Sequence, residues 1–176
     1  MLPYEGPFDL REGGTVTASY ADNPAVKSTA TFARIERIPM TVVYASSQET
    51  GIGDAANLVD GDPSTTWHTM YSVTVANYPH WVDFDAGEAK LIRGFVYLPR
   101  QDGGTNGNIR EYTVQVSDDG KTWSKPVAAG SFGRGTGEQR VELERPVKAR
   151  YIRFTALSSQ NGADFAGGAE FSVIAD

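Results

Sequence analysis

The clearest pattern along this 176-residue chain is the alternation of apolar and polar positions, which is typical of β-strands. In the segment 110–117, Tyr112, Val114 and Val116 share one face of the predicted strand, and polar residues occupy the other. Segments of this kind recur along the chain, separated by Gly, Asn, Asp and Pro. The pattern predicts strands at 41–45, 80–85, 90–98, 109–117, 138–144, 150–157 and 170–175.

Turn signals separate these segments, and helical signals are almost absent. The segment 117–121 contains an Asp-Gly pair, which is typical of a β-hairpin turn. Only the segment 53–58 suggests a helical turn. Many short strands with turns between them predict an all-β protein, an antiparallel jelly-roll β-sandwich of about eight strands.

A domain boundary is predicted near Ile38 and Pro39. Before it, the segments 14–21 and 25–35 form two possible strands around the turn 22–24. Two strands cannot bury a core by themselves. Residues 1–38 are therefore either the remnant of an upstream sandwich domain or a hairpin arm packed on the main domain, 39–176, and we favour the remnant.

Composition excludes several classes of function. A net charge of −6 and a pI near 4.9 argue against nucleic acid or an anionic membrane as partner. The absence of Cys excludes disulfides and thiolate metal sites, and two His residues give little support for zinc. No apolar run approaches the roughly 20 residues that a membrane helix needs. The first residues lack the basic and apolar regions of a signal peptide, so we expect the chain to be part of a longer protein.

One loop has the chemistry of a cation site. Asp60 and Asp62 flank Gly61, Pro63 stiffens the exit, and Thr65 adds a hydroxyl. Calcium takes about six to eight oxygen ligands from carboxylates and carbonyls, and this loop is rich in both. The spacing does not match the EF-hand pattern, and an ordinary type I turn explains the same residues. Both interpretations stay open at this point.

A second set of residues suits the recognition of a polar ring. Trp67 is predicted to anchor the loop in the core, while His68 opens a long loop and Tyr71 offers an aromatic plane. Arg100, at the end of a strand, presents a planar fork of N–H donors. Phe165 lies among small polar residues. The alternatives are a satisfied core histidine, a solvated arginine and a phenylalanine packed under its own loop.

The order of these motifs resembles the discoidin or F5/8 type C family, and most closely its family 32 carbohydrate-binding modules. The resemblance begins with the segments 45–50 and 57–69 and covers the chain from about Pro39 to the C-terminus. It continues through the segments 78–85, 98–100, 108–112, 117–123, 149–154 and 169–171.

The resemblance implies a galactose-binding-like jelly roll with one structural calcium ion and a sugar site. The calcium ligands would be side-chain oxygens of Asp60, Asp62, Thr65 and Glu170, with carbonyls near Asn57 and Ala169. The sugar-binding residues would be His68, Arg100, Glu49, Tyr71, Asn106 or Asn108, and Phe165. Tyr71 stands where the family often has a larger indole, which leaves the ring preference open.

The N-terminal segments 4–10 and 13–18 resemble the end of an immunoglobulin-like domain of the chitobiase C-terminal type. Together the two resemblances imply a non-catalytic module, monomeric when isolated, that targets a parent hexosaminidase or α-L-fucosidase. The expected ligands are glycans that end in galactose, N-acetylgalactosamine or N-acetylglucosamine. The expected location is outside the cytoplasm of a bacterium, in the periplasm, on the surface or secreted.

Two other functions are considered. A glycosidase needs two carboxylates facing each other across a cleft, and Asp60 and Asp62 are better assigned to a cation. A discoidin-type adhesion module would bind a protein or membrane surface through bulky apolar or basic loops. The loop 101–108 is instead polar and rich in glycine, and the net charge disfavours anionic lipid.

Overall fold

The computed structural model describes residues 3, 5–6, 14–32 and 38–175. The chain divides into two compact units, Met1–Glu36 and Arg37–Asp176. In the first unit, β1 (Gly14–Ser19) pairs antiparallel with β2 (Lys27–Phe32), which confirms the core of the two predicted strands. Residues 33–35 of the second predicted strand lie outside the described residues. The assignment of this unit to a domain remnant stays a prediction.

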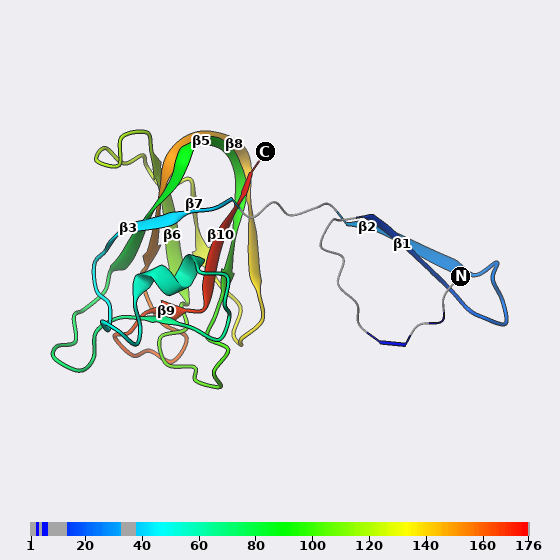
Figure 1. The fold of residues 1–176 in the computed structure, drawn as a ribbon, viewed down its shortest axis with the longest axis horizontal. Coiled ribbons are helices and arrows are strands. Elements are labelled where there is room, and N and C mark those ends of the chain that lie inside the picture. Colours follow the sequence, from blue (N-terminus) through cyan, green and yellow to red (C-terminus); the bar gives the residue numbers. More distant parts are fainter. Residues whose placement is uncertain (1–2, 4, 7–13, 33–37, 176) are drawn as a thin grey trace. The chain divides into compact units, whose positions relative to one another are not determined.

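The second unit contains the sandwich (Figure 1). Its larger sheet has the order β10-β5-β8-β6-β7, and β3 also pairs with β5. A separate two-stranded sheet joins β4 to β9. The strands are β3 (Thr41–Ala45), β4 (Trp67–His68), β5 (His80–Leu98), β6 (Glu111–Ser117), β7 (Ala128–Ser131), β8 (Gln139–Ala156), β9 (Gly167–Gly168) and β10 (Glu170–Ala175), with a 3₁₀-helix η1 (Ala55–Val59).

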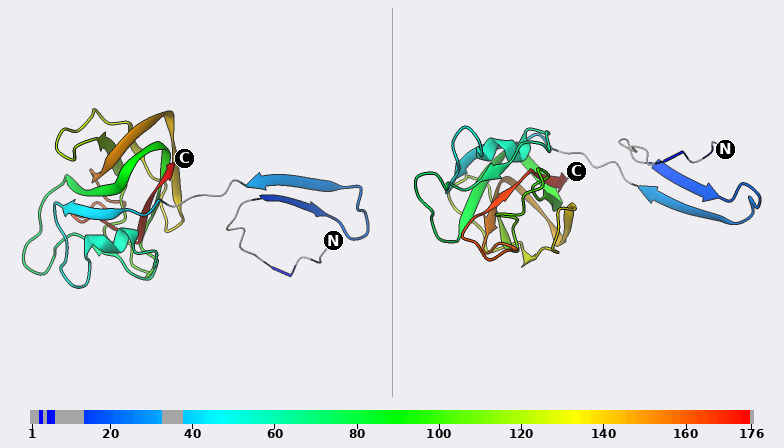
Figure 2. Two further views of the ribbon diagram at one scale, coloured as in Figure 1. Left: turned by 45° about the horizontal axis from the view of Figure 1, so that its top comes forward. Right: turned by 90° about the horizontal axis from the view of Figure 1, so that it is seen from below.

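Two long strands, β5 and β8, pair antiparallel over most of their length and supply both layers of the sandwich. The first part of β5 pairs with β3, and its last part pairs with β10. The two views of Figure 2 show the strands curving between these partners. The pairing register shifts between Asp85 and Lys90, where Gly87 adopts a φ of 77°.

The separate strands predicted at 80–85 and 90–98 are therefore one strand with an irregularity at the predicted break. The strands predicted at 138–144 and 150–157 are likewise one strand, β8. The prediction at 170–175 is confirmed, and the helical turn predicted at 53–58 is η1, shifted by one or two residues. Residues 38–175 contain eight strands, β3 to β10, which agrees with the predicted all-β antiparallel sandwich.

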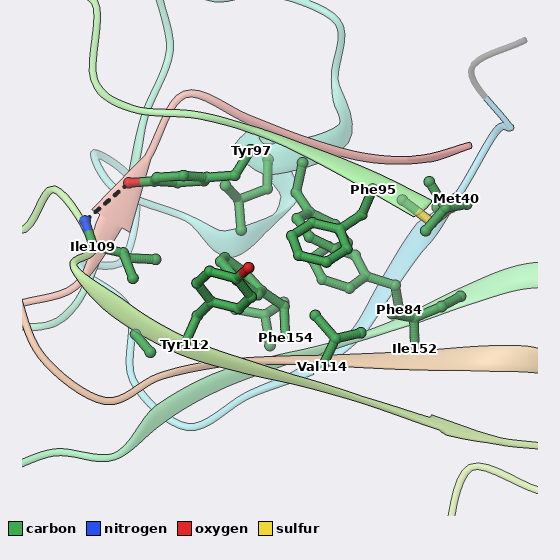
Figure 3. Close-up of a cluster of buried hydrophobic side chains, with 14 of the residues drawn as sticks. Met40, Phe84, Phe95, Tyr97, Ile109, Tyr112, Val114, Ile152 and Phe154 are labelled. Carbon is green, nitrogen blue, oxygen red and sulfur yellow. Dashed lines mark hydrogen bonds between the residues drawn. The ribbon is translucent and has the colours of Figure 1, made fainter. Parts of the chain in front are cut away.

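The core lies between the layers and is rich in aromatic rings (Figure 3). The ring of Phe171, from β10, stacks on Phe84 at 4.9 Å and on Phe154 at 4.7 Å, each with an interplanar angle of 17°. Phe84 and Phe154 come from β5 and β8, so these stacks join strands that are far apart in the sequence. Buried aromatic rings contribute large apolar areas, and this packing fixes the strand ends from which the loops emerge. In the part of the chain that the structure describes, no helix is long and apolar enough to span a membrane.

Candidate functional site

A pocket of about 680 Å³ lies among the loops at one end of the sandwich. It brings together five residues that the sequence analysis assigned to sugar binding and several that it did not. The predicted ones are Glu49, His68, Tyr71, Arg100 and Asn106. The others include Ile52, Asp102, Ser64 and Thr66.

The short β4–β9 ladder places His68 in this pocket. Trp67 pairs with Gly168, and His68 pairs with Gly167. A Cβ on Gly167 would lie 2.6 Å from the Trp67 carbonyl oxygen, and one on Gly168 would lie 2.4 Å from the Tyr97 ring. Only glycine therefore allows the two short strands to approach so closely. Trp67 is fully buried and its Nε1 donates to the Ser47 carbonyl at 3.0 Å, so it anchors the loop as predicted.

His68 presents a hydrogen-bond acceptor to the pocket. Its side chain is largely buried, and Nδ1 lies 2.6 Å from the Thr69 carbonyl oxygen. A carbonyl can only accept, so we assign the proton to Nδ1 and a free lone pair to Nε2. Burial lowers the pKa of His68, and the positive charge of Arg100 lowers it further. The imidazole is therefore neutral at neutral pH.

Two aromatic rings flank His68. The Tyr71 ring meets it edge-on, with centroids 5.2 Å apart, and the Phe165 ring lies 5.3 Å away at 43°. Tyr71 is 49% exposed and lines the pocket, so its ring is open to a ligand. Phe165 is half-buried and does not line the pocket; its carbonyl oxygen accepts a hydrogen bond from the Tyr78 hydroxyl. Phe165 therefore contacts His68 without forming the second wall that was predicted.

Arg100 is fixed by its neighbours before any ligand arrives. Its Nε and Nη2 donate to the two carboxylate oxygens of Asp102 at 3.2 and 2.5 Å, and Nη1 donates to the Asn106 carbonyl at 3.1 Å. A guanidinium carries five N–H donors, so two remain for a ligand. Asp102 was missed by the sequence analysis, although its position two residues after Arg100 was a usable signal. The ion pair lowers the pKa of Asp102.

Glu49 fastens the loop that carries Tyr71. Its Oε2 accepts from the backbone N–H groups of Tyr71 at 2.7 Å and Ser72 at 3.0 Å, and its Oε1 accepts from the Ser72 hydroxyl. The Ser72 hydroxyl is the main cause of the lowered pKa of Glu49, and the two backbone donors follow. Glu49 lines the pocket as predicted, but its carboxylate serves first to hold the neighbouring loop.

The two asparagines of the loop 101–108 have different positions. Asn106 lines the pocket, and its Oδ1 accepts from Asn161 Nδ2 at 3.1 Å, which leaves its own amide N–H groups for a ligand. Asn108 is fully buried, and its Oδ1 accepts from the Arg100 backbone N–H at 3.2 Å. Of the two predicted alternatives, Asn106 or Asn108, the structure therefore places only Asn106 at the pocket, because the Asn108 side chain is covered by the protein. It supports the backbone of Arg100 instead.

The loop predicted to hold calcium is closed by its own hydrogen bonds. Asp60 accepts from the Asp62 N–H and from the Thr65 hydroxyl, each at 2.8 Å. Asp62 Oδ1 accepts from the Ser64 hydroxyl at 2.6 Å and from its N–H at 2.9 Å, and these bonds lower the pKa of Asp62. Among the described residues, no group of three or more His, Asp or Glu side chains is close enough to hold a metal ion. Calcium stays a prediction.

The other predicted calcium ligands lie on elements that pack near this loop. Asn57 belongs to η1, and its Nδ2 donates to the Thr66 carbonyl at 3.0 Å. Ala169 and Glu170 are buried, and Glu170 begins β10, which packs against η1. The fold therefore brings the segments 57–65 and 169–170 to the same side of the unit, and their oxygens are of the type that calcium prefers.

A buried hydroxyl joins the loops that form the pocket. Tyr97 Oη donates to the Gly167 carbonyl at 2.7 Å. It also accepts from the Ile109 N–H at 3.1 Å, the bond drawn in Figure 3. The Gly167 N–H in turn donates to the Gly107 carbonyl at 2.8 Å. Burial raises the pKa of Tyr97, so the hydroxyl keeps its proton. The loops that carry His68 and Arg100 are thus held through one junction.

Comparison with known proteins is consistent with this geometry. A family model described as F5/8 type C domain matches residues 42–171. A sialidase from Micromonospora viridifaciens is 37% identical over 171 residues, which is 95% of this chain and 26% of the sialidase. A galactose oxidase from Gibberella zeae is 35% identical over 134 residues, 75% of this chain and 19% of the oxidase. The chain thus spans about a quarter or less of the length of these curated relatives.

Two solved structures from Clostridium perfringens share the fold of the second unit. A family 32 module in complex with GalNAc-β-1,3-galactose superimposes with a TM-score of 0.72 at 28% identity, covering 79% of this chain and 99% of the module. The family 32 module of NanJ, in complex with galactose, has a TM-score of 0.69 at 28% identity, covering 78% of this chain and 96% of the module.

Replacing Tyr97 with Phe tests the junction. The Tyr97→Phe variant leaves the Gly167 carbonyl and the Ile109 N–H buried without this partner, so we expect it to lower the free energy of unfolding by about 1–3 kcal/mol. Urea unfolding followed by Trp fluorescence measures the change. The matched control is Tyr20→Phe, at a position that is 66% exposed, where we expect a change within about 0.5 kcal/mol. Equal effects of the two substitutions would contradict the role of the Tyr97 hydroxyl.

Proposed function

Because the chain belongs to the F5/8 type C domain family, we propose that it is a non-catalytic carbohydrate-binding module of a larger glycan-active protein. The observation that carries the proposal is the combination at one pocket of a neutral His68 acceptor, a pre-oriented Arg100 fork and an exposed Tyr71 ring. The ligand is a glycan ending in galactose, N-acetylgalactosamine or another hexosamine.

The three groups match what a sugar ring offers. A sugar hydroxyl is both donor and acceptor, so His68 Nε2 accepts from one hydroxyl while the two remaining N–H groups of Arg100 donate to oxygens beside it. The apolar C–H face of a galactose-type ring packs on the Tyr71 ring. The Asn106 amide adds a further donor. Because Asp102 and Glu49 fix these groups in advance, little ordering is needed when the sugar binds.

The relatives support a role as an accessory part. The two C. perfringens modules were solved with galactose and with GalNAc-β-1,3-galactose. The curated relatives are named sialidase, galactose oxidase and lacto-N-biosidase, and this chain spans 26%, 19% and 13% of them. The sialidase match covers 95% of the chain and so includes part of the first unit. We propose a glycoside hydrolase as parent, acting outside the cytoplasm.

The pocket has no carboxylates suited to hydrolysis. A glycosidase needs one carboxylic acid with a raised pKa and a second carboxylate across the cleft. Glu49 and Asp102 line the pocket, but both are committed to hydrogen bonds and both have lowered pKa values. Neither can act as the proton donor at neutral pH. This argument supports a binding role.

One observation favours a second function, adhesion to a protein or membrane surface. Ile52, Val73 and Val75 are 75%, 83% and 47% exposed, and Ile52 lines the pocket. The loop that follows Tyr71 therefore exposes more apolar side chains than the loop 101–108, whose polar composition argued against adhesion. Exposed apolar side chains next to a polar pocket are typical of interaction sites.

Calcium is proposed as a structural ligand of the loop 60–65 and the start of β10. The oxygens of Asp60, Asp62, Thr65 and Glu170 would hold it, and its charge would stabilise the acidic loop.

Substituting Arg100 tests the sugar site. Arg100→Ala removes the remaining N–H donors, and hydrogen bonds to charged groups contribute about 1.5–3 kcal/mol each, so we expect at least a tenfold loss of affinity for methyl β-galactoside. Isothermal titration calorimetry measures the affinity, and circular dichroism checks the fold. The control is Arg140→Ala on β8, where the arginine pairs with Glu142 at the surface.

The wild-type result decides the main proposal. Binding to no galactose- or hexosamine-terminated glycan, with calcium present, would contradict it. Co-sedimentation with lipid vesicles would then test the adhesion function.

The titration of His68 gives a pH dependence. The pKa of His68 is lowered below its usual 6.5, so the imidazole is neutral in both folded and unfolded chains above that pH. We expect a constant affinity from about pH 8 to 6.5. The affinity falls as pH drops below the lowered pKa, because Nε2 then carries a proton and cannot accept. Glu49 and Asp102 stay charged over this range, since their pKa values are lowered too.

Titrations at pH 8, 7, 6 and 5 measure this profile, at temperatures where the protein is folded. His80 is also buried with a lowered pKa, so the unfolded chain takes up protons first and stability itself declines below about pH 6.5. The control is His68→Gln, which removes the titrating group while keeping a polar side chain. An unchanged pH profile in this variant would show that another group is responsible.

Calcium binding is tested by thermal unfolding in excess calcium and in EGTA. A ligand that binds only the folded state stabilises it by about 2.7 kcal/mol at a hundred times its dissociation constant, so we expect a clear rise in Tm with calcium. Asp62→Asn should remove most of this rise, while the control Asp118→Asn, on another turn, should keep it. A Tm that does not respond to calcium would contradict the proposed ligand.

A further inference from the structure

The side-chain amide of Asn106 is the one group lining the pocket whose orientation decides whether it donates or accepts. An asparagine amide carries an NH₂ group on one side and an acceptor oxygen on the other. The two sides have nearly the same shape, so their orientation follows from the hydrogen bonds around them. For Asn106 the deciding neighbour is Asn161, whose amide lies 3.1 Å away, Nδ2 to Oδ1.

The orientation of Asn161 is set by a backbone group. The Ala163 N–H lies 3.2 Å from Asn161 Oδ1, and an N–H can only donate, so the oxygen of Asn161 must face it. The Ser159 hydroxyl lies 2.9 Å from the same oxygen and 2.7 Å from the Ala163 carbonyl, and its single proton does not decide the matter. The NH₂ group of Asn161 is therefore left to face Asn106.

A donor on Asn161 requires an acceptor on Asn106. Asn106 accordingly turns its oxygen to Asn161, and its own NH₂ group remains for the pocket that it lines. The backbone carbonyl of Asn106 also accepts from Arg100 Nη1 at 3.1 Å, so this residue contacts both Arg100 and Asn161. The direction of the Asn106 amide thus follows from the Ala163 N–H through two hydrogen bonds in series.

The two loops that carry these asparagines are joined by backbone pairing. Ile109 and Ser159 form an antiparallel bridge, and the Gln160 N–H donates to the Asn108 carbonyl at 2.7 Å. This pairing holds the two amides at hydrogen-bond distance. Asn161 is exposed and is not among the residues that line the pocket, so any effect that it has on a ligand passes through its neighbour.

We propose that Asn161 is a positioning residue of the sugar site, which fixes the Asn106 amide with its NH₂ group towards the ligand. This inference rests on the proposed sugar-binding function of His68, Arg100 and Asn106. Arg100 and Asn106 then both donate to oxygens of the sugar, and His68 Nε2 accepts from a sugar hydroxyl. An Asn106 amide turned the other way would present an oxygen that competes with His68 for the hydroxyl protons of the ligand.

The variant Asn161→Asp tests the orientation. A carboxylate still accepts from the Ala163 N–H but cannot donate to Asn106, so it draws the NH₂ group of Asn106 to itself. We expect the affinity for methyl β-galactoside to fall about three- to tenfold, as the loss of one hydrogen bond gives. Asn161→Ala should weaken binding less, because it frees the amide without turning it.

Isothermal titration calorimetry with the full chain measures these affinities, and circular dichroism checks the fold. The matched control is Asn23→Asp, the same substitution at an exposed position that does not line the pocket, where the affinity should not change. An unchanged affinity in the folded Asn161→Asp variant would overturn the proposal.

A double-mutant cycle separates positioning from a merely structural role. If Asn161 acts only through the Asn106 amide, Asn161→Asp should have no further effect in a chain that already carries Asn106→Ala. An equal loss of affinity in both backgrounds would show that Asn161 supports the loop and does not position the amide, which would also overturn the proposal.

The side-chain amide signal of Asn106 in ¹⁵N-edited NMR spectra gives a second readout, identified by its loss in Asn106→Ala. Saturating methyl β-galactoside should shift this signal in the wild type and shift it less in Asn161→Asp. A wild type that binds the sugar with no shift of this signal would contradict the assigned orientation while leaving the sugar site in place. Binding of no sugar at all would overturn the proposed function, which the Arg100→Ala experiment tests independently, and this inference with it.

Discussion

The site depends on one point of close contact, the backbone of Gly167. Its N–H donates to Gly107, its carbonyl accepts from the buried Tyr97 hydroxyl, and it pairs with His68 across the β4–β9 ladder. Three loops that are far apart in the sequence are joined here, and no side chain fits because the Trp67 carbonyl would lie 2.6 Å from a Cβ. Since buried polar groups are costly without partners, a shift of any one loop would leave hydrogen bonds of the others unmade. The geometry of His68 and Arg100 therefore follows from backbone packing.

The charged groups of the pocket act mainly on each other and on the backbone. Asp102 orients the Arg100 guanidinium, and Glu49 fastens the loop of Tyr71 by three hydrogen bonds. Carboxylates that could suggest catalysis thereby become fixed supports for other groups of the pocket, the Arg100 guanidinium and the Tyr71 loop. Pre-orientation reduces the entropy lost on binding, but a shallow site with few contacts still gains little from one sugar. In the proposed role, attachment to a larger glycan-active protein would compensate, because a tethered module meets the same glycan at high effective concentration.

Much of the fold could be predicted because the alternation of apolar and polar residues indicates which face of a strand is buried. The strands at 41–45 and 170–175 follow from this pattern alone. The strands β4 and β9 have two residues each, too few for any period, and they depend on the tight fit of Gly167 and Gly168. Residue types and the family resemblance nominated His68 and Arg100, and both line the pocket, but burial is a property of the folded chain. For that reason the burial of Asn108 and the role of Glu49 as a loop support were not foreseen. Asp102 was missed for a different reason, since its position two residues after Arg100 was visible in the sequence.

The loop 60–66 links the two candidate ligands of this module. Its two carboxylates, Asp60 and Asp62, accept hydrogen bonds from Thr65 and Ser64. Thr65 and Ser64 also line the pocket. A cation bound to the two carboxylates would compete for oxygens that now accept hydrogen bonds within the loop. It would thereby change the position of the pocket wall next to Thr66. The groups proposed to meet the terminal sugar, Arg100 and His68, are fixed separately, through Asp102 and Gly167. Coupling between calcium and glycan would therefore pass through residues 64–66, the part of the pocket wall that the cation loop builds.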